Sequence, residues 1–167
     1  MTEFALTAYQ AAFVDDLTTV DVRFLVVGGV ALRAHGVFRA TRDLDILVER
    51  TKRNATRLLP VLARRFRNTP AALTIEWLMT RQKRLSLPSE LENEVDILTS
   101  LGALDFTVAF SKRCELTLEA RRLPALGLAE LIYSKAVSAD TNDAPAAKER
   151  DAADFAALVA VWDRRRR

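Results

Sequence analysis

The sequence predicts an α+β fold: a mixed β-sheet flanked by helices, with a small helical part at the C-terminus. The first observation is a set of short apolar runs typical of buried strands, at residues 23–27, 43–49 and 94–100. The second is apolar spacing of three and four residues, which predicts helices at 3–19 and 52–66. Because strands and helices are interspersed along the chain, we expect helices layered on one sheet.

The remaining elements follow in chain order. Gly28 and Gly29 end the first strand, a short helix follows, and Gly36 suits its left-handed stop. Pro60 should kink or split the helix at 52–66. Residues 73–80 and 84–87 predict two strands joined by a polar turn, and 113–126 should be mostly extended. Helices are expected at 127–139 and 146–163, joined by the polar linker 138–145. We expect residues 1–120 to form the core and 121–167 to form a helical extension packed on it.

The composition is that of an ordinary globular protein. Of the 167 residues, 50% are hydrophobic and 28% are charged. The single cysteine, Cys114, excludes an internal disulfide and suits a reducing compartment. With neither a signal peptide nor a membrane-spanning run in sight, we expect a cytoplasmic protein that does not enter the membrane. The net charge is +3 and the arginines are clustered, which indicates either a solvated surface or attraction to a polyanion such as RNA or a nucleotide.

The stretch VVGGVALRAHGVFRATRDLDILV, residues 26–48, contains two features that suit phosphate and metal binding. The glycine pair at Gly28 and Gly29 lies between a strand and a helix, where free backbone N–H groups can receive a phosphate. Asp43 and Asp45 lie two residues apart on a predicted strand, so both side chains share one face. Two neighbouring carboxylates can hold a hard divalent cation such as Mg²⁺. Taken separately, a glycine pair is also typical of a tight turn, and two aspartates are also typical of a solvated strand end.

A third carboxylate comes from the run EVDILTS. Asp96 is followed by Ile-Leu, as Asp45 is, and it joins Asp43 and Asp45 if the two strands are neighbours. Glu94 is the alternative on the same face. Three carboxylates, metal ions and a phosphate-binding corner are the groups used in two-metal phosphoryl transfer.

This stretch resembles the nucleotidyltransferase superfamily, and within it the AbiEii-type toxins and minimal nucleotidyltransferases. The matching residues are Gly28, Gly29, Ala31, His35, Gly36, Arg39, Thr41, Asp43 and Asp45. The resemblance covers about 25 residues and is weaker around Asp96 and over the last 40 residues. It implies a fold like that of DNA polymerase β and transfer of a nucleoside monophosphate from an NTP to a hydroxyl, with release of pyrophosphate. The acceptor would be tRNA or protein, and the chain would be the toxin of a toxin–antitoxin pair with an antitoxin protein as partner.

The resemblance also implies roles for individual residues. Asp43, Asp45 and Asp96 would hold two Mg²⁺ ions, and Asp96 would also help to deprotonate the attacking hydroxyl. Gly28 and Gly29 would bind the triphosphate. Because Val30 stands where many relatives have serine, backbone amides would do this with help from Arg39 or Arg42.

The C-terminal part adds a lysine and two aspartates. Lys135 lies on the apolar stripe of its helix, so its partner is either an internal carboxylate or, as the resemblance suggests, the triphosphate. Asp151 and Asp154 share one face of the last helix and would orient Lys135 or Arg150.

The other candidate residues have mainly structural interpretations. His35, the only histidine, precedes Gly36 and is expected to fix the local loop, with substrate contact as the alternative. Cys114 is expected to be inert, and Trp77 and Trp162 are expected to lie in the core.

Two other functional classes stay open from the sequence. One is a non-catalytic member of the fold that binds nucleotide or a partner. The other is an antibiotic nucleotidyltransferase, although clustered arginines favour a nucleotide or RNA partner over a polar drug.

Overall fold

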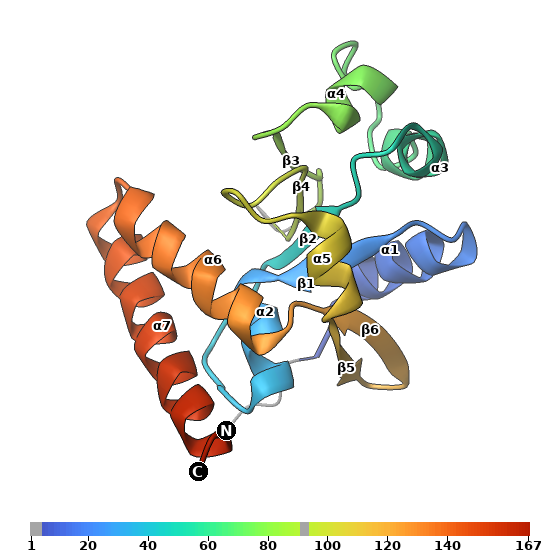
Figure 1. The fold of residues 1–167 in the computed structure, drawn as a ribbon. Coiled ribbons are helices and arrows are strands. Elements are labelled where there is room, and N and C mark those ends of the chain that lie inside the picture. Colours follow the sequence, from blue (N-terminus) through green and yellow to red (C-terminus); the bar gives the residue numbers. More distant parts are fainter. Residues whose placement is uncertain (1–4, 91–93) are drawn as a thin grey trace.

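The computed structural model describes residues 5–90 and 94–167 and contains a six-stranded mixed sheet with helices around it (Figure 1). The strand order is β3-β4-β2-β1-β6-β5. The strands are β1 (Phe24–Val27), β2 (Leu44–Val48), β3 (Arg84–Ser86), β4 (Val95–Leu98), β5 (Cys114–Leu118) and β6 (Arg121–Ala125). The α+β fold class predicted from the sequence is confirmed.

Parallel and antiparallel pairs alternate in this sheet. β2 runs antiparallel to β1 and parallel to β4, while β6 runs parallel to β1 and antiparallel to β5. The edge strand β3 runs antiparallel to β4. The strands β1, β2 and β4 are buried along most of their length, as expected of strands in the centre of a sheet.

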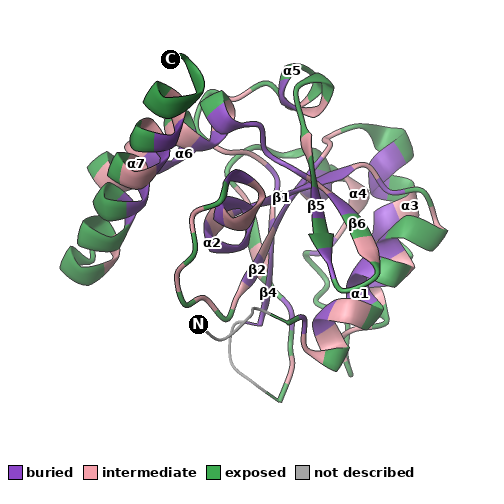
Figure 2. Cartoon of the chain, turned by 90° about the horizontal axis from the view of Figure 1, so that it is seen from below, coloured by how far each residue is buried: buried purple, intermediate pink, exposed green. Residues whose placement is uncertain are grey.

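Seven α-helices and one 3₁₀ helix are found in the part of the chain that the structure describes. They are α1 (Ala8–Thr19), α2 (Gly28–Ala31), η1 (Leu32–His35), α3 (Lys52–Ala63), α4 (Ile75–Met79), α5 (Phe106–Ser111), α6 (Leu128–Thr141) and α7 (Pro145–Arg165). In both views α1 and α3 lie at one side of the molecule, and α6 and α7 form a pair at the opposite side (Figure 2). The buried faces of these helices are turned towards the sheet or towards each other. No helix in residues 5–90 and 94–167 combines the length and apolar character needed to cross a membrane.

Local capping explains several helix boundaries. The Thr7 hydroxyl accepts from the backbone N–H of Gln10, and the Gln10 side chain accepts from the N–H of Thr7, so α1 begins at Ala8. The predicted start at residue 3 falls partly on residues 1–4, which lie outside the described residues. Gly36, at φ 78°, ends η1 in the left-handed conformation that the sequence predicts.

The structure corrects four local predictions. Residues 75–79 form the helix α4 instead of a strand, because the Thr74 side chain caps the N–H of Trp77 and begins a helical turn. Pro60 does not split its helix, since α3 continues to Ala63 and buries Val61 and Leu62. The polar linker is shorter than predicted, because α6 extends to Thr141 and α7 begins at Pro145. The helix α5, capped by Asp105, was not predicted.

The sheet extends past the boundary that the sequence suggested at residue 120. β6, at 121–125, pairs with both β1 and β5, and the helical pair begins only at Leu128. Pro124 lies within β6 and does not interrupt it.

Candidate active site

Four residues form one lateral row across the sheet. Val27 pairs with Asp45, Asp45 pairs with Asp96, and Asp96 pairs with Ser86. Paired residues on neighbouring strands place their side chains on the same face, about 5 Å apart along the row. The strand order therefore brings Asp45 beside Asp96, directly next to the point where β1 ends at the glycine pair.

Gly28 lies directly against Asp45. Its φ is 63°, and a Cβ there would lie 2.1 Å from Asp45 Oδ2. Both the backbone conformation and the close approach therefore require glycine.

Gly29 has a different neighbour. A Cβ at this position would lie 2.8 Å from both Arg39 Nη2 and Thr41 Oγ1. Because neither glycine has a Cβ, the Asp45 carboxylate can pack against Gly28, and the loop before β2 can pack against Gly29.

The Asp45 carboxyl is only partly exposed, and its environment disfavours ionisation. Its pKa is raised from 3.8 to about 6, chiefly by burial and also by the negative charges of Asp96 and Asp43, although Arg84 and Lys135 act in the opposite direction. In the described part of the chain, no group hydrogen-bonds to this carboxyl. A bound cation or a proton would therefore stabilise the Asp45 carboxyl group.

Asp96 is completely buried and is held by two groups of β3. Arg84 Nη2 pairs with Asp96 Oδ2, and the Ser86 hydroxyl donates to Asp96 Oδ1. The hydrogen bond to Asp96 raises the pKa of the Arg84 guanidinium. Neither Arg84 nor Ser86 was identified from the sequence, although their spacing of two residues on a strand puts both on one face.

As they stand, the carboxylates do not form a closed ligand set. No group of three His, Cys, Asp or Glu side chains positioned to hold a metal ion is found among residues 5–90 and 94–167. Asp43 lies just before β2 with its side chain partly exposed. Asp45 and Asp96, which pair in register on neighbouring strands, are the best candidates for metal ligands.

Glu94, the alternative third carboxylate, faces the N-terminus of α1. Its side chain accepts from the Thr7 hydroxyl, and its backbone oxygen accepts from Gln10 Nε2 at 2.9 Å. These contacts give Glu94 a role in attaching α1 to the sheet.

A buried ionic network connects the loop before β2 with both C-terminal helices. Arg39 donates from Nε and Nη2 to the two oxygens of Asp154, at 2.8 and 3.0 Å. Lys135 Nζ lies 2.8 Å from both Asp151 Oδ1 and Asp154 Oδ2. Burial opposes ionisation of Asp154, but the hydrogen bonds from Arg39 and Lys135 hold its pKa below the ordinary value.

This network places several residues that the sequence singled out. Of the two partners expected for Lys135, the structure shows the internal carboxylates. Asp151 and Asp154 face Lys135, whereas Arg150 is exposed. The sequence missed the contact between Arg39 and Asp154, since these residues are 115 positions apart. The Arg42 side chain is exposed, and its backbone oxygen accepts from Gln10.

His35 fixes the chain near the glycine corner, which is formed by Gly28 and Gly29 between β1 and α2. Its Nε2–H donates to the Leu126 carbonyl at 2.8 Å, and burial lowers its pKa. Cys114 Sγ lies 3.6 Å from the same nitrogen, and burial raises the pKa of the thiol. A buried imidazole that binds a backbone carbonyl agrees with the loop-fixing role expected from the sequence.

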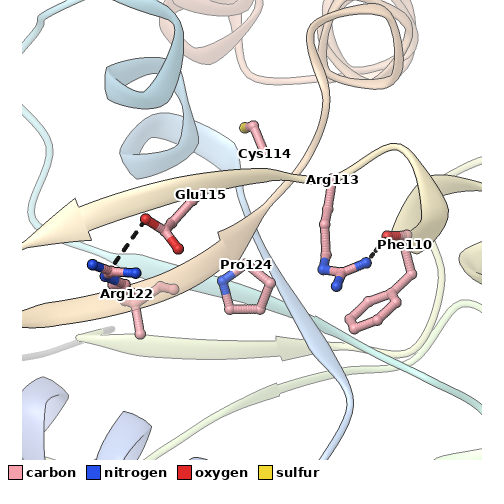
Figure 3. Close-up of a pocket in the computed structure, with 7 residues that line it drawn as sticks. Phe110, Arg113, Cys114, Glu115, Arg122 and Pro124 are labelled. Carbon is pink, nitrogen blue, oxygen red and sulfur yellow. Dashed lines mark hydrogen bonds and ion pairs between the residues drawn. The ribbon is translucent and has the colours of Figure 1, made fainter.

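A hollow of about 530 Å³ lies elsewhere, between α5 and the β5–β6 hairpin (Figure 3). Arg113 lies over the Phe110 ring at 4.1 Å, and Arg122 pairs with Glu115 at 3.7 Å across the hairpin. None of the three candidate aspartates lines this hollow. The site at the glycine corner is therefore separate from it.

Comparison with known proteins gives a fold and no sequence family. Neither a family model nor a curated protein matches the chain. Among solved structures, the chain is similar to an antigenic nucleotidyltransferase-like protein from Paracoccidioides brasiliensis. The identity is 14%, the TM-score is 0.60, and the match covers 90% of this chain and 73% of the other. The chain, with its carboxylate pair beside a glycine corner, therefore has a nucleotidyltransferase-like fold.

Proposed function

We propose that this protein is an Mg²⁺-dependent nucleotidyltransferase that moves a nucleoside monophosphate from an NTP to a hydroxyl acceptor. The observation that carries the proposal is the position of Asp45, beside Asp96 and against Gly28, with its pKa raised to about 6. Perturbed carboxyls gathered at a glycine corner are typical of functional sites. The nucleotidyltransferase-like fold supports the same reaction class.

The donor set fits Mg²⁺. This ion binds one or two protein carboxylates and completes its shell with phosphate oxygens and water. Asp45 and Asp96 supply the carboxylates, with Asp43 near them, and the mutual repulsion of these charges is what a cation would relieve. Bound there, the metal would polarise the reacting phosphate and neutralise its developing charge. Asp96 would help to take the proton of the attacking hydroxyl.

The phosphate groups of the NTP would lie at the glycine corner. Gly28 and Gly29 would offer their backbone N–H groups at the start of α2, and Arg39 lies against Gly29. Arg42 is exposed and can reach a phosphate from outside. Lys135 uses two of its three N–H groups on aspartates, which leaves one for the triphosphate.

The acceptor and the biological role belong to the same proposal. The AbiEii-like motif at residues 26–48 supports a toxin that modifies tRNA or protein and is paired with an antitoxin.

The test is nucleotide transfer by wild type, Asp45→Asn and Asp163→Asn, with labelled NTPs, Mg²⁺ and tRNA, protein, aminoglycoside or lincosamide as acceptors. We expect Mg²⁺-dependent labelling of tRNA or protein by wild type and by the Asp163 control, which changes an exposed carboxylate. Asp45→Asn should lose activity by at least about 100-fold. If only the aminoglycoside or the lincosamide is labelled, the acceptor is an antibiotic and not tRNA or protein. If wild type labels none of the acceptors and binds neither NTP nor metal, the enzyme proposal is wrong.

One observation favours a second candidate, a non-catalytic member of the fold. Arg84 and Ser86 occupy both oxygens of Asp96, as they would in a site that no longer binds metal. Calorimetry separates the two, because a non-catalytic protein would bind NTP with the same affinity with and without Mg²⁺.

A further inference from the structure

The Arg84–Asp96 pair joins a buried anion to an exposed cation. The Asp96 side chain has no exposed surface, whereas 63% of the Arg84 side chain is exposed. Arg84 extends from β3, which is at the edge of the sheet. Its guanidinium can therefore leave Asp96 for solvent without disturbing another strand.

The same guanidinium compensates the charge of Asp45. Asp45 has no hydrogen-bonding partner among the described residues, and of the two cations that act on it, Arg84 has the larger effect and Lys135 the smaller. Lys135 is buried between two aspartates and is not free to move. Without metal, Arg84 is therefore the cation beside Asp45 and Asp96 that can move away from them.

A divalent cation and the Arg84 guanidinium compete for the same oxygens. A metal bound by Asp45 and Asp96 would use an Asp96 oxygen that already accepts from Arg84 or Ser86. It would also place two positive charges a few ångströms from the guanidinium, and like charges at that distance repel strongly when partly buried.

We propose that Arg84 is a displaceable internal counter-ion, which holds Asp96 in the metal-free protein and leaves it when a divalent cation binds. This inference rests on the proposed function, because it assigns the metal to Asp45 and Asp96. Arg84 thereby lowers the affinity for free metal, and once released it stands at the rim of the site as a cation for phosphate oxygens.

The first test is binding of Mn²⁺ alone, followed by its paramagnetic resonance signal, to wild type, Arg84→Gln and Arg81→Gln. Arg84→Gln should bind about three- to tenfold more tightly, because a competing charge is gone. Arg81→Gln should match wild type, since Arg81 is exposed and, within residues 5–90 and 94–167, binds only the Gly102 carbonyl. Equal or weaker binding by a folded Arg84→Gln overturns the inference.

The second test uses the wild-type chain, so it does not depend on how a variant folds. The Arg84 Nε–H resonance, assigned by its loss in Arg84→Gln or by backbone connectivity, is followed by NMR during titration with Mg²⁺. We expect it to move towards the position of a free arginine as metal binds. An unchanged resonance at saturating Mg²⁺ overturns the inference.

The two proposals fail in different ways. If wild type transfers nucleotide while Arg84 neither competes with metal nor moves, only the counter-ion inference is wrong. If no divalent cation binds wild type or Arg84→Gln, the metal site and the counter-ion inference are both wrong.

Discussion

Gly28 is constrained twice, by its backbone and by its neighbour. Its φ of 63° disfavours any side chain, and a Cβ would overlap the Asp45 carboxylate. Gly36 has a similar φ of 78°, but nothing lies within 4 Å of a Cβ placed there. The two glycines therefore separate backbone strain from steric overlap.

Gly28→Ala should destabilise the protein by about 2–4 kcal/mol, and Gly36→Ala by about 1 kcal/mol. The difference represents the overlap with Asp45. Urea unfolding of both variants measures it, and the double variant Gly28→Ala/Asp45→Ala should recover part of the loss. Equal effects at the two glycines would show that Asp45 moves aside at no cost.

Asp45 should make the metal-free protein less stable as the pH rises. Its pKa is 3.8 when unfolded and about 6 when folded, so the unfolded chain releases its proton first. Stability is unaffected below about pH 4, falls as the pH rises from there to about 6, and stays reduced above it.

Asp45→Asn should therefore stabilise the metal-free protein by about 1–3 kcal/mol at pH 8, and the gain should vanish near pH 4. Chemical unfolding in the presence of a chelator at several pH values measures this. A loss of stability at pH 8 would mean that the carboxylate is well compensated without metal. The expected exchange of stability for function is common at active sites.

At the scale of elements, one carboxylate of α7 attaches three segments. Asp154 binds Arg39 of the loop before β2 and Lys135 of α6, and Arg39 in turn lies against the glycine corner. The helical pair thereby supports the position of the glycine pair, Gly28 and Gly29. Removing one partner of a buried ionic group costs more than removing an exposed ion pair, because the remaining charges stay buried.

Asp154→Ala should cost about 2–4 kcal/mol, since it leaves both Arg39 and Lys135 with fewer partners. Asp163→Ala, on the exposed face of the same helix, should change stability by less than about 0.5 kcal/mol. Thermal unfolding compares the two variants. If they are equally stable, the network does not hold α7 to the corner.

At the scale of the whole molecule, the proposed ligands would connect its two parts. Asp45 and Asp96 come from the sheet, whereas Lys135 comes from the helical pair, and a triphosphate between them would touch both. A ligand that binds only the folded chain raises its unfolding temperature.

A non-hydrolysable NTP with Mg²⁺, at about 100 times its dissociation constant, should stabilise the protein by about 2.7 kcal/mol. This corresponds to a rise of several degrees in the unfolding temperature. The nucleotide with chelator should have a much smaller effect. Equal shifts with and without Mg²⁺ would contradict a metal-bridged nucleotide and favour the non-catalytic candidate.

Features that depend on neighbours within a few residues could be predicted from the sequence. The glycine corner, the Gly36 helix stop and the strand with Asp45 all follow from short-range stereochemistry and side-chain alternation. The α+β fold class follows from the order of such elements. The prediction of a strand at 73–80 was wrong. Its apolar run has no clear period, and the Thr74 cap favours the helix α4.

Which distant residues come into contact depends on the packing of the whole fold. The order β3-β4-β2-β1 aligns Ser86, Asp96, Asp45 and Val27 in one row, and it brings Arg84 onto Asp96. The packing of α7 brings Asp154 to Arg39 across 115 residues. Such contacts depend on strand order and helix packing, which arise from burial of the whole core and leave no signal in the local sequence. For that reason the sequence indicated the carboxylates of the candidate site, whereas the fold was needed to reveal the arginine that pairs with one of them.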